Sequence, residues 1–356
     1  MMKNKLFVGV ITFFVSLVLC IGLLNFTNSD SKKDYYFDRT FVRNNIFKLE
    51  KTVDKMIYES EYLMGVQSDG LIVEKEIVKN EIDKKEHKFY ISDYDLKKIS
   101  YKTICFPQVL DIRLFTKRDL FYVKNFELFD YHFDSKINRK IKLKDFKVVS
   151  LKTLKNSNSK MLCLGELFDG SLYKSGFFSI DIYSGEIILL KVLKESEKSN
   201  IISTSLQYSG SFTSNSDNDM ITYCCNKYSR IYFFDSVGQK LVNEMITNED
   251  VPLPKILSNK KGDSFYARGT TRNTNMGMFI KKNKIFVFSA RSASETALIV
   301  DEYSLYSFKY EKSYRLNYAN FGSKNIDVVF YNDNKVIIGF NTGYAFFSFA
   351  KSIDRV

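Results

Sequence analysis

The sequence predicts an all-β domain that follows a single N-terminal membrane helix. The chain of 356 residues is 45% hydrophobic, which is enough for a core, and its 32 Phe and 23 Tyr favour strands. From about Leu71 almost to the C-terminus, apolar and polar residues alternate, which is the pattern of half-buried strands. One long apolar run precedes this part of the chain.

The apolar run is long enough to cross a membrane. Residues 6–24 carry no charge, and in a helix they span roughly 30 Å, the thickness of the hydrocarbon core of a bilayer. Lys3 and Lys5 precede the run, so the short N-terminus is expected to stay inside. We therefore predict a signal-anchor over residues 1–26, and a single-pass protein of the cell membrane whose C-terminal domain is extracytoplasmic, in the periplasm or cell envelope.

Two other fates of the N-terminus remain open. The stretch Leu17-Val18-Leu19-Cys20 partly fits a lipoprotein signal in which Cys20 is acylated, although Leu19 is bulky where a small residue is usual. A cleaved signal needs small residues at the cut, and none of the usual pattern follows Leu24. In all three cases the bulk of the chain leaves the cytosol.

Residues 27–70 are predicted to form a tether and a short helical segment. Residues 25–33 are polar, as a tether should be. Further on, apolar residues recur at near-helical spacing with Lys and Glu between them: Phe41, Ile46, Leu49, Val53, Ile57 and Leu63. This spacing predicts one helix or two short ones ahead of a β-domain at residues 71–356.

The β-domain is predicted to be a β-propeller of about six four-stranded blades. Its strand-like segments include residues 220–225, 284–289 and 304–310, and they group into units that recur after roughly 45 to 50 residues, a period typical of blades. Turns at residues 181–185 and 235–238 supply the Asp and Gly that tight hairpins need. A double β-sandwich and a seven-bladed ring remain open.

Two hairpin units carry a resemblance to a known group. FFSIDIYSGEIILL and IYFFDSVGQKLV resemble the hairpins of bacterial six-bladed β-propeller envelope proteins, the TolB-like group. The resemblance covers about residues 88–350 and consists of a hairpin pattern. It implies the fold, and it implies binding of a protein or ligand more than a reaction, because many envelope members of the group bind partners and some are enzymes. No functional residue can be carried over.

Motifs for catalysis, metals and cofactors are scarce. The two histidines, His87 and His132, are too few for a His-rich metal site, and neither a nucleophile elbow nor a glycine-rich phosphate loop occurs. The acidic stretch at residues 214–219 lacks the glycine and glutamate of a calcium loop. We therefore predict no metal and no cofactor. The alternative function is that of a propeller lyase or glycoside hydrolase, whose catalytic residues the sequence leaves unknown. Conceivable catalytic acids are Glu166, Asp181, Asp235 and Glu302.

Four cysteines follow the apolar run: Cys105, Cys163, Cys224 and Cys225. In an oxidising compartment they allow three pairings, among which the sequence does not choose. Cys224 and Cys225 should point to opposite faces of a strand, so they are not expected to pair with each other. Buried, small apolar roles are predicted for most of the four.

The predicted binding residues are Arg268, Arg272 and Arg291. They lie in polar loops beside predicted strands, where arginine can bind carboxylates and phosphates. The net charge of +12 is scattered in ones and twos along the chain, which argues against a specific nucleic-acid site. The expected partners are thus the membrane, through the N-terminal helix, and a protein or small anionic ligand at the loop face of the propeller.

Overall fold

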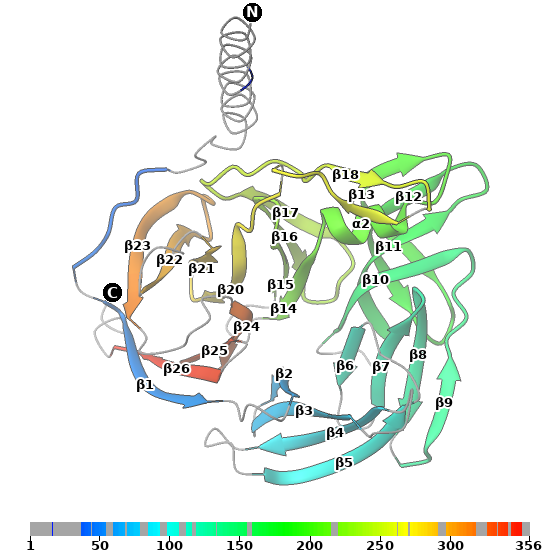
Figure 1. Cartoon of the computed structure of the whole chain (residues 1–356), viewed down its shortest axis with the longest axis horizontal. Helices are drawn as coiled ribbons and strands as arrows, with labels where there is room; N and C mark the ends of the chain where they lie inside the picture. Colours follow the sequence, from blue (N-terminus) through cyan, green and yellow to red (C-terminus); the bar gives the residue numbers. More distant parts are fainter. Residues whose placement is uncertain are drawn as a thin grey trace, which may run out of the picture.

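A computed structural model shows a ring of sheets around a central axis (Figure 1). It describes residues 16, 37–43, 45–54, 60–67, 70–78, 85–92, 98–106, 112–115, 119–132, 134–154, 159–214, 220–261, 263–269, 271–290, 297–317, 326–332, 334–340 and 343–350. Side chains are described from residue 37 to 53 and, with few exceptions, from 119 onward. The predicted anchor at residues 1–26, Cys20 and Arg291 lie outside the described part, apart from residue 16.

Six four-stranded antiparallel sheets, the blades, make up the ring. Blade 1 consists of β2 (Ser60–Gln67), β3 (Gly70–Val78), β4 (Lys85–Ser92) and β5 (Lys98–Phe106). Blade 2 consists of β6 (Ile112–Phe115), β7 (Asp119–Lys124), β8 (Glu127–His132) and β9 (Ile137–Lys140). Blade 3 consists of β10 (Phe146–Thr153), β11 (Lys160–Phe168), β12 (Tyr173–Asp181) and β13 (Ile187–Ser196). Blade 4 consists of β14 (Gly210–Ser214), β15 (Met220–Cys225), β16 (Arg230–Asp235) and β17 (Leu241–Ile246). Blade 5 consists of β20 (Asn275–Lys281), β21 (Lys284–Ser289), β22 (Ala297–Ser304) and β23 (Tyr310–Asn317). Blade 6 consists of β24 (Ile326–Asn332), β25 (Lys335–Phe340), β26 (Gly343–Phe349) and β1 (Phe47–Asp54).

The innermost strands close the ring. Each of β2, β6, β10, β14, β20 and β24 contacts the innermost strand of both neighbouring blades, so the described sheets form one cycle of six. The fold is therefore a six-bladed β-propeller, which confirms the predicted fold and decides against the double sandwich and the seven-bladed ring. Blade 6 is completed from the other end of the chain, because β1 pairs with β26 from Phe47 opposite Phe349 to Asp54 opposite Gly343.

The predicted helical segment is wrong over residues 47–54 and 60–67, which are β1 and β2. In β1, Phe47 is buried, Lys48 and Glu50 are exposed, and Leu49 packs against the core, which is the period of a strand. The near-helical spacing of the apolar residues in this segment is a weak local signal. The hydrogen-bonded pairing of β1 with β26 outweighs it and makes the segment a strand. The propeller accordingly begins before the predicted boundary at residue 71.

The hydrophobic core is divided among the interfaces between adjacent blades. One cluster joins blades 5 and 6 around Phe47, Phe279 and Phe286, and others join blades 2 and 3, 3 and 4, and 4 and 5. Cys225 packs in the cluster between blades 3 and 4 while Cys224 packs in the one between blades 4 and 5, so the prediction of opposite faces is confirmed. Both are free and buried, as is Cys163, and the side chain of Cys105 lies outside the described part.

The predicted hairpin turns are confirmed at two outer corners. Asp181 Oδ1 accepts hydrogen bonds from the backbone N–H groups of Tyr183 and Ser184, each at 3.0 Å, and Gly185 takes a φ of 74° that other residues rarely adopt. Asp235 and Gly238 form the corresponding turn between β16 and β17, with a φ of 61° at the glycine. The repeated Asp and Gly thus report turns rather than a site.

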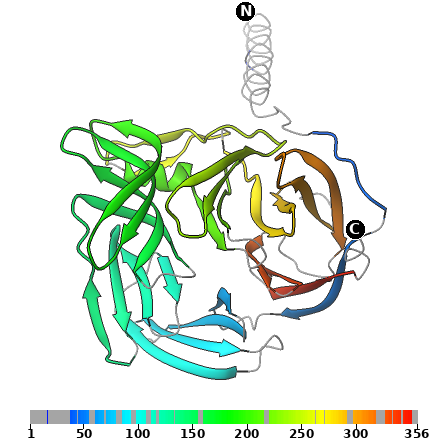
Figure 2. The ribbon, with the colours of Figure 1, turned by 180° about the vertical axis from the view of Figure 1, so that it is seen from behind.

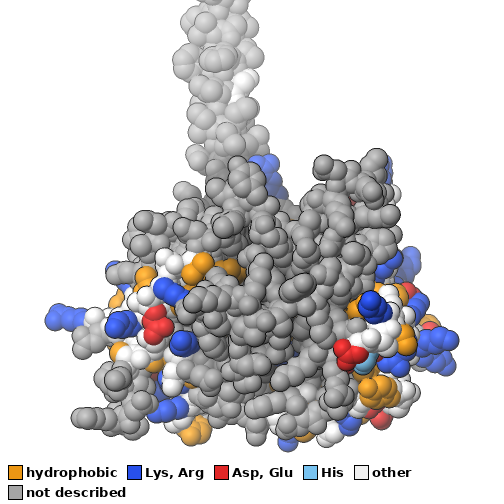
Figure 3. Space-filling view, turned by 90° about the horizontal axis from the view of Figure 1, so that it is seen from below, with side chains coloured by type: hydrophobic (Ala, Val, Ile, Leu, Met, Phe, Trp, Pro, Cys, Tyr) orange, Lys and Arg blue, Asp and Glu red, His pale blue; other side chains and the backbone are white. Residues whose placement is uncertain are grey.

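Basic side chains are spread over the described surface. On the face shown in Figure 3, Lys and Arg lie in separate groups at both sides, interleaved with acidic and apolar side chains. Within the described residues, no helix is both long enough and apolar enough to cross a membrane.

Candidate functional site

One connection between blades is much longer than its neighbours. Residues 141–145 suffice between blades 2 and 3, whereas residues 247–274 run between blades 4 and 5. This connection carries an additional two-stranded sheet, the hairpin of β18 (Ile256–Ser258) and β19 (Ser264–Tyr266), which belongs to no blade. In Figure 1 the hairpin lies at the rim of the ring beside the helix α2 (Ile201–Gln207).

The hairpin exposes an apolar pair. Leu257 and Phe265 are directly opposite each other across the two strands, so their side chains share one face, and they are 49% and 46% exposed. The adjacent helix α2 exposes Ile202 to 45%. Single exposed apolar side chains are ordinary on protein surfaces, whereas adjacent ones on an element outside the blades make a candidate contact surface.

Cations surround this pair. Between residues 255 and 268 the chain has four basic residues and one carboxylate, a net charge of +3 (four minus one), and all four cations are exposed: Lys255, Lys260, Lys261 and Arg268. The carboxylate, Asp263, accepts a hydrogen bond from Asn259 Nδ2 at 2.8 Å within the turn. The hairpin is therefore amphipathic and positively charged, and it suits an anionic partner that also offers an apolar layer.

The hairpin is held firmly against the propeller. The Tyr266 hydroxyl donates to the carbonyl of Leu206 at the end of α2, at 2.8 Å, and Gln207 Nε2 donates to the carbonyl of Pro254 at 2.9 Å. Burial raises the pKa of Tyr266, so this hydroxyl keeps its proton at neutral pH. At the far end, Asn259 Oδ1 accepts the backbone N–H groups of Lys261 and Asp263 and fixes the turn.

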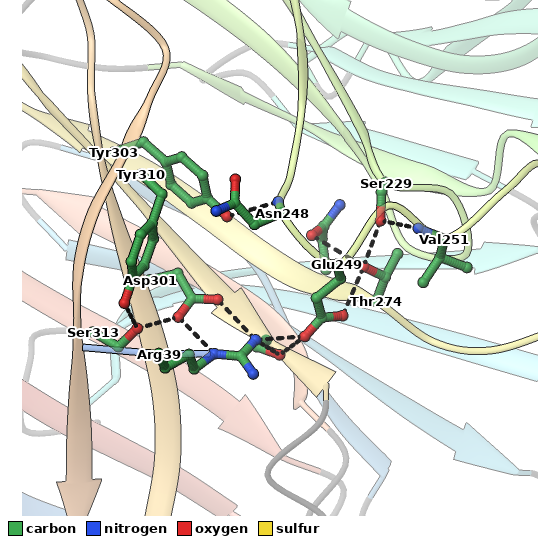
Figure 4. Close-up of polar contacts among 12 residues, drawn as sticks. Arg39, Ser229, Asn248, Glu249, Val251, Thr274, Asp301, Tyr303, Tyr310 and Ser313 are labelled. Atoms are coloured by element: carbon green, nitrogen blue, oxygen red, sulfur yellow. Dashed lines mark hydrogen bonds and ion pairs between the residues drawn. The ribbon is translucent and has the colours of Figure 1, made fainter. Parts of the chain in front are cut away.

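A buried polar cluster closes the base of the long connection. Thr274 Oγ1 lies 3.0 Å from Glu249 Oε2 and 3.1 Å from Ser229 Oγ, and the backbone N–H of Val251 donates to Ser229 Oγ at 2.8 Å (Figure 4). All these side chains are nearly inaccessible to solvent. The two ends of the connection are thus tied together at the ring.

Arg39 completes this cluster from the N-terminal part of the chain. Its Nη2 lies 2.6 Å from Glu249 Oε1, and its Nε and Nη2 lie 2.9 and 3.0 Å from the two carboxylate oxygens of Asp301 (Figure 4). The Arg39 side chain is 4% exposed and both acids are 3% exposed. Burial alone would lower the pKa of Arg39, but the hydrogen bonds and charges of Asp301 and Glu249 outweigh it and hold that pKa above its usual value.

The segment that delivers Arg39, residues 37–43, is called the strap here. It runs along the outer strand of blade 5, where the backbone N–H of Val42 donates to the carbonyl of Ser313 and that of Ser313 donates to the carbonyl of Thr40. The Phe37 ring packs edge-on against Tyr310 at 5.0 Å between centroids. Figures 1 and 2 show the strap passing β23 before β1 joins β26. The strap therefore covers one blade edge and ties the chain upstream to blades 4 and 5.

The structure places the predicted binding arginines unequally. Arg268 is exposed directly after β19 and belongs to the cationic rim, while Arg272 is half-buried on the return to β20. Leu257, Phe265 and Arg39 were not predicted as site residues. The motif KILSNKKGDSFYAR, with its alternation on both sides of a basic turn, is the signal that could have revealed the hairpin.

The conceivable catalytic acids are all occupied by structural contacts. Glu166 is 1% exposed and accepts hydrogen bonds from Ser175 Oγ, Ser199 Oγ and the backbone N–H of Asn200. Asp181 and Asp235 hold turns, and Glu302 accepts the Tyr314 hydroxyl. Among the described residues, no group of three or more His, Cys, Asp or Glu is arranged to hold a metal ion.

No family model and no curated protein matches this chain. Solved structures with a similar arrangement include a member of the DUF4221 family from Bacteroides vulgatus, with a TM-score of 0.47 and 10% identity over 85% of this chain and 97% of the other. BamB from Moraxella catarrhalis has a TM-score of 0.44 and 10% identity over 86% and 99%. The Cps50 (Swd1) β-propeller domain from Myceliophteria thermophila has a TM-score of 0.40 and 8% identity over 85% and 100%. At such values, the assignment of the fold depends on the sheet topology described above.

Proposed function

We propose that this chain is a membrane-anchored, extracytoplasmic binding module in which the propeller is the scaffold and the β18–β19 hairpin is the contact element. The observation that carries the proposal is the exposed pair Leu257 and Phe265 within a rim of four cations. The pair lies on a hairpin that is not part of any blade. An apolar pair with a cationic rim fits an anionic partner with an apolar layer. The predicted N-terminal anchor supports the membrane setting.

The contacts of the acids favour binding over the lyase or glycosidase alternative. Glu166 is enclosed by hydroxyl and backbone donors, and Glu302 is held by Tyr314 and lies 3.6 Å from both Lys284 and Lys312. A general acid or nucleophile has to reach a substrate. Acids locked in such contacts serve the fold instead.

Site-specific photo-crosslinking in intact membranes tests the proposal. A photo-reactive residue in place of Phe265 in the full-length chain should form adducts with a partner, whether protein or lipid. The matched control is Ile137, which is 61% exposed on β9, the outermost strand of blade 2. Equal labelling from the two positions would mean that the hairpin is ordinary surface, and the proposal would be wrong.

A further inference from the structure

We infer that the anionic partner of the hairpin is the headgroup surface of a lipid bilayer, and that the contact fixes the orientation of the propeller on its membrane. The inference rests on the proposed function and names the partner of the same site. Four features of the chain support it: the size of the apolar pair, its cationic rim, the rigidity of the hairpin and the place where the N-terminal part of the chain meets the ring.

The apolar pair is the right size for a bilayer interface and small for a protein interface. A stable protein contact buries about 800 Å² on each partner, which takes roughly 20–30 residues on each side. The hairpin offers Leu257 and Phe265, with Ile202 on the neighbouring helix. Side chains of these types insert at the boundary between headgroups and acyl chains without needing a shaped pocket.

The rim matches the charge of such a surface. Lys255, Lys260, Lys261 and Arg268 are all exposed and lie within 14 residues of sequence. Anionic headgroups attract each nearby Lys or Arg by an amount that corresponds to about fivefold in binding. Asp263, the one acid in the stretch, is bonded within the turn and leaves the rim predominantly positive.

The hairpin is already in one conformation before it meets a partner. The Tyr266 hydroxyl donates a hydrogen bond to α2, and the Asn259 side chain accepts hydrogen bonds within the turn. The backbone N–H of Ala267 donates to the carbonyl of Lys255 at 2.9 Å across the strands. Little conformational entropy is then lost on docking. A rigid hairpin transmits its own orientation to the ring.

The N-terminal part of the chain meets the ring at the start of the long connection that carries the hairpin. Arg39 in the strap contacts Glu249, and Glu249 is bonded to Thr274 at the other end of the long connection. Between Leu24, the last residue of the apolar run in the predicted anchor, and Phe37, the chain can extend at most roughly 45 Å. A tether of this length would keep the ring close to the bilayer, and docking of the hairpin would choose one orientation of the tethered ring.

The chain has no Trp, which allows a direct test. The full-length Phe265→Trp variant is reconstituted in vesicles of phosphatidylcholine with or without phosphatidylglycerol, including lipids brominated on the acyl chains. We expect a blue-shifted emission and strong quenching by bromine when phosphatidylglycerol is present. The control, Ile137→Trp, should show neither. A second reporter, Leu257→Trp, covers the case in which the first variant folds poorly.

Charge reversal at the rim tests the electrostatic part. Adding Lys260→Glu and Lys261→Glu to the Phe265→Trp reporter should reduce docking by more than tenfold and remove its dependence on phosphatidylglycerol. Emission and quenching at residue 265 equal to those at residue 137 in anionic vesicles would overturn the lipid inference. If photo-crosslinking at residue 265 then gave a protein adduct, the proposed function would stand with another partner. If it gave no specific adduct, both proposals would be wrong.

Discussion

Two buried carboxylate clusters of this propeller are satisfied in different ways. Between blades 4 and 5, Glu249 and Asp301 share the guanidinium of Arg39, which comes from the other end of the chain. At blade 3, Glu166 is equally inaccessible but has only neutral donors from nearby in the sequence: Ser175, Ser199 and the backbone N–H of Asn200. The first cluster joins distant segments and the second supports a local turn into α2.

The two clusters differ in how strongly they depend on charge. Removing Arg39 leaves two acids, each 3% exposed, without a counter-charge, and such a change is among the most destabilising known. Removing one donor from Glu166 leaves the others in place. The two clusters should therefore respond very differently to substitution.

The largest effect is expected for Arg39→Ala. The variant should lower the free energy of unfolding by about 3–5 kcal/mol, because both buried acids lose their counter-charge. Denaturant unfolding of the full-length protein in detergent measures this, and proteolysis near residue 40 reports release of the strap. Arg43→Ala, an exposed arginine four residues away, is the control and should change stability by less than about 0.5 kcal/mol.

A double-mutant cycle sharpens the contrast. Arg39→Ala and Glu249→Ala should be coupled by about 0.5–3 kcal/mol, since each removes the same ion pair. Arg39→Ala and Glu166→Ala share no partner and should add within about 0.5 kcal/mol. Coupling of similar size in both cycles would show that the clusters are not independent.

A smaller effect is expected for Glu166→Gln. The substitution replaces one carboxylate oxygen, which accepts hydrogen bonds, by an NH₂ group, which cannot accept them from the surrounding donors. The free energy of unfolding should therefore fall by about 1–3 kcal/mol. Glu197→Gln, on the exposed turn nearby, should have almost no effect. A loss as large as that of Arg39→Ala would contradict the distinction between the clusters.

The smallest effect is expected at a half-buried acid in a turn. The backbone N–H of Ser184 and the Ser159 hydroxyl lower the pKa of Asp181 below its usual value. Stabilisation by this turn is then fully present above the ordinary Asp pKa and is lost as the pH falls through the lowered value. Asp181→Asn should remove this acid-dependent part, seen as a flatter profile of melting temperature below about pH 4 and a small decrease of the melting temperature at pH 7.

The sequence predicted an element well where residues close by in the chain determine its structure, and poorly where distant contacts determine it. Hairpins such as residues 220–235 carry their own alternation and turn residues, so their strands were predicted closely. The predicted strand at residues 304–310 is wrong, because Ser304 Oγ accepts the N–H groups of Tyr306 and Ser307 and Phe308 takes a φ of 56°, which makes a turn between β22 and β23. Its alternating aromatic residues look like a strand but lie at a corner.

The candidate site was predicted only in part for a related reason. Arg268 was predicted because arginine in loops often binds ligands, but the apolar pair Leu257 and Phe265 is recognisable as a surface only when the hairpin is seen outside the blades. Arg39 gives no local signal, since both its acids lie more than 200 residues away in sequence. Pairings of this kind depend on the closed ring.

The pairing of β1 with β26 has a consequence for the order in which the protein assembles. The first strand of the ring cannot find its neighbour until the last strand has been synthesised, so β1 must wait unpaired while five blades form. Closure is then a late event that depends on both ends at once. A truncation that removes only β26 would leave β1 without a partner and β25 with an open edge, and both would be prone to association with other chains.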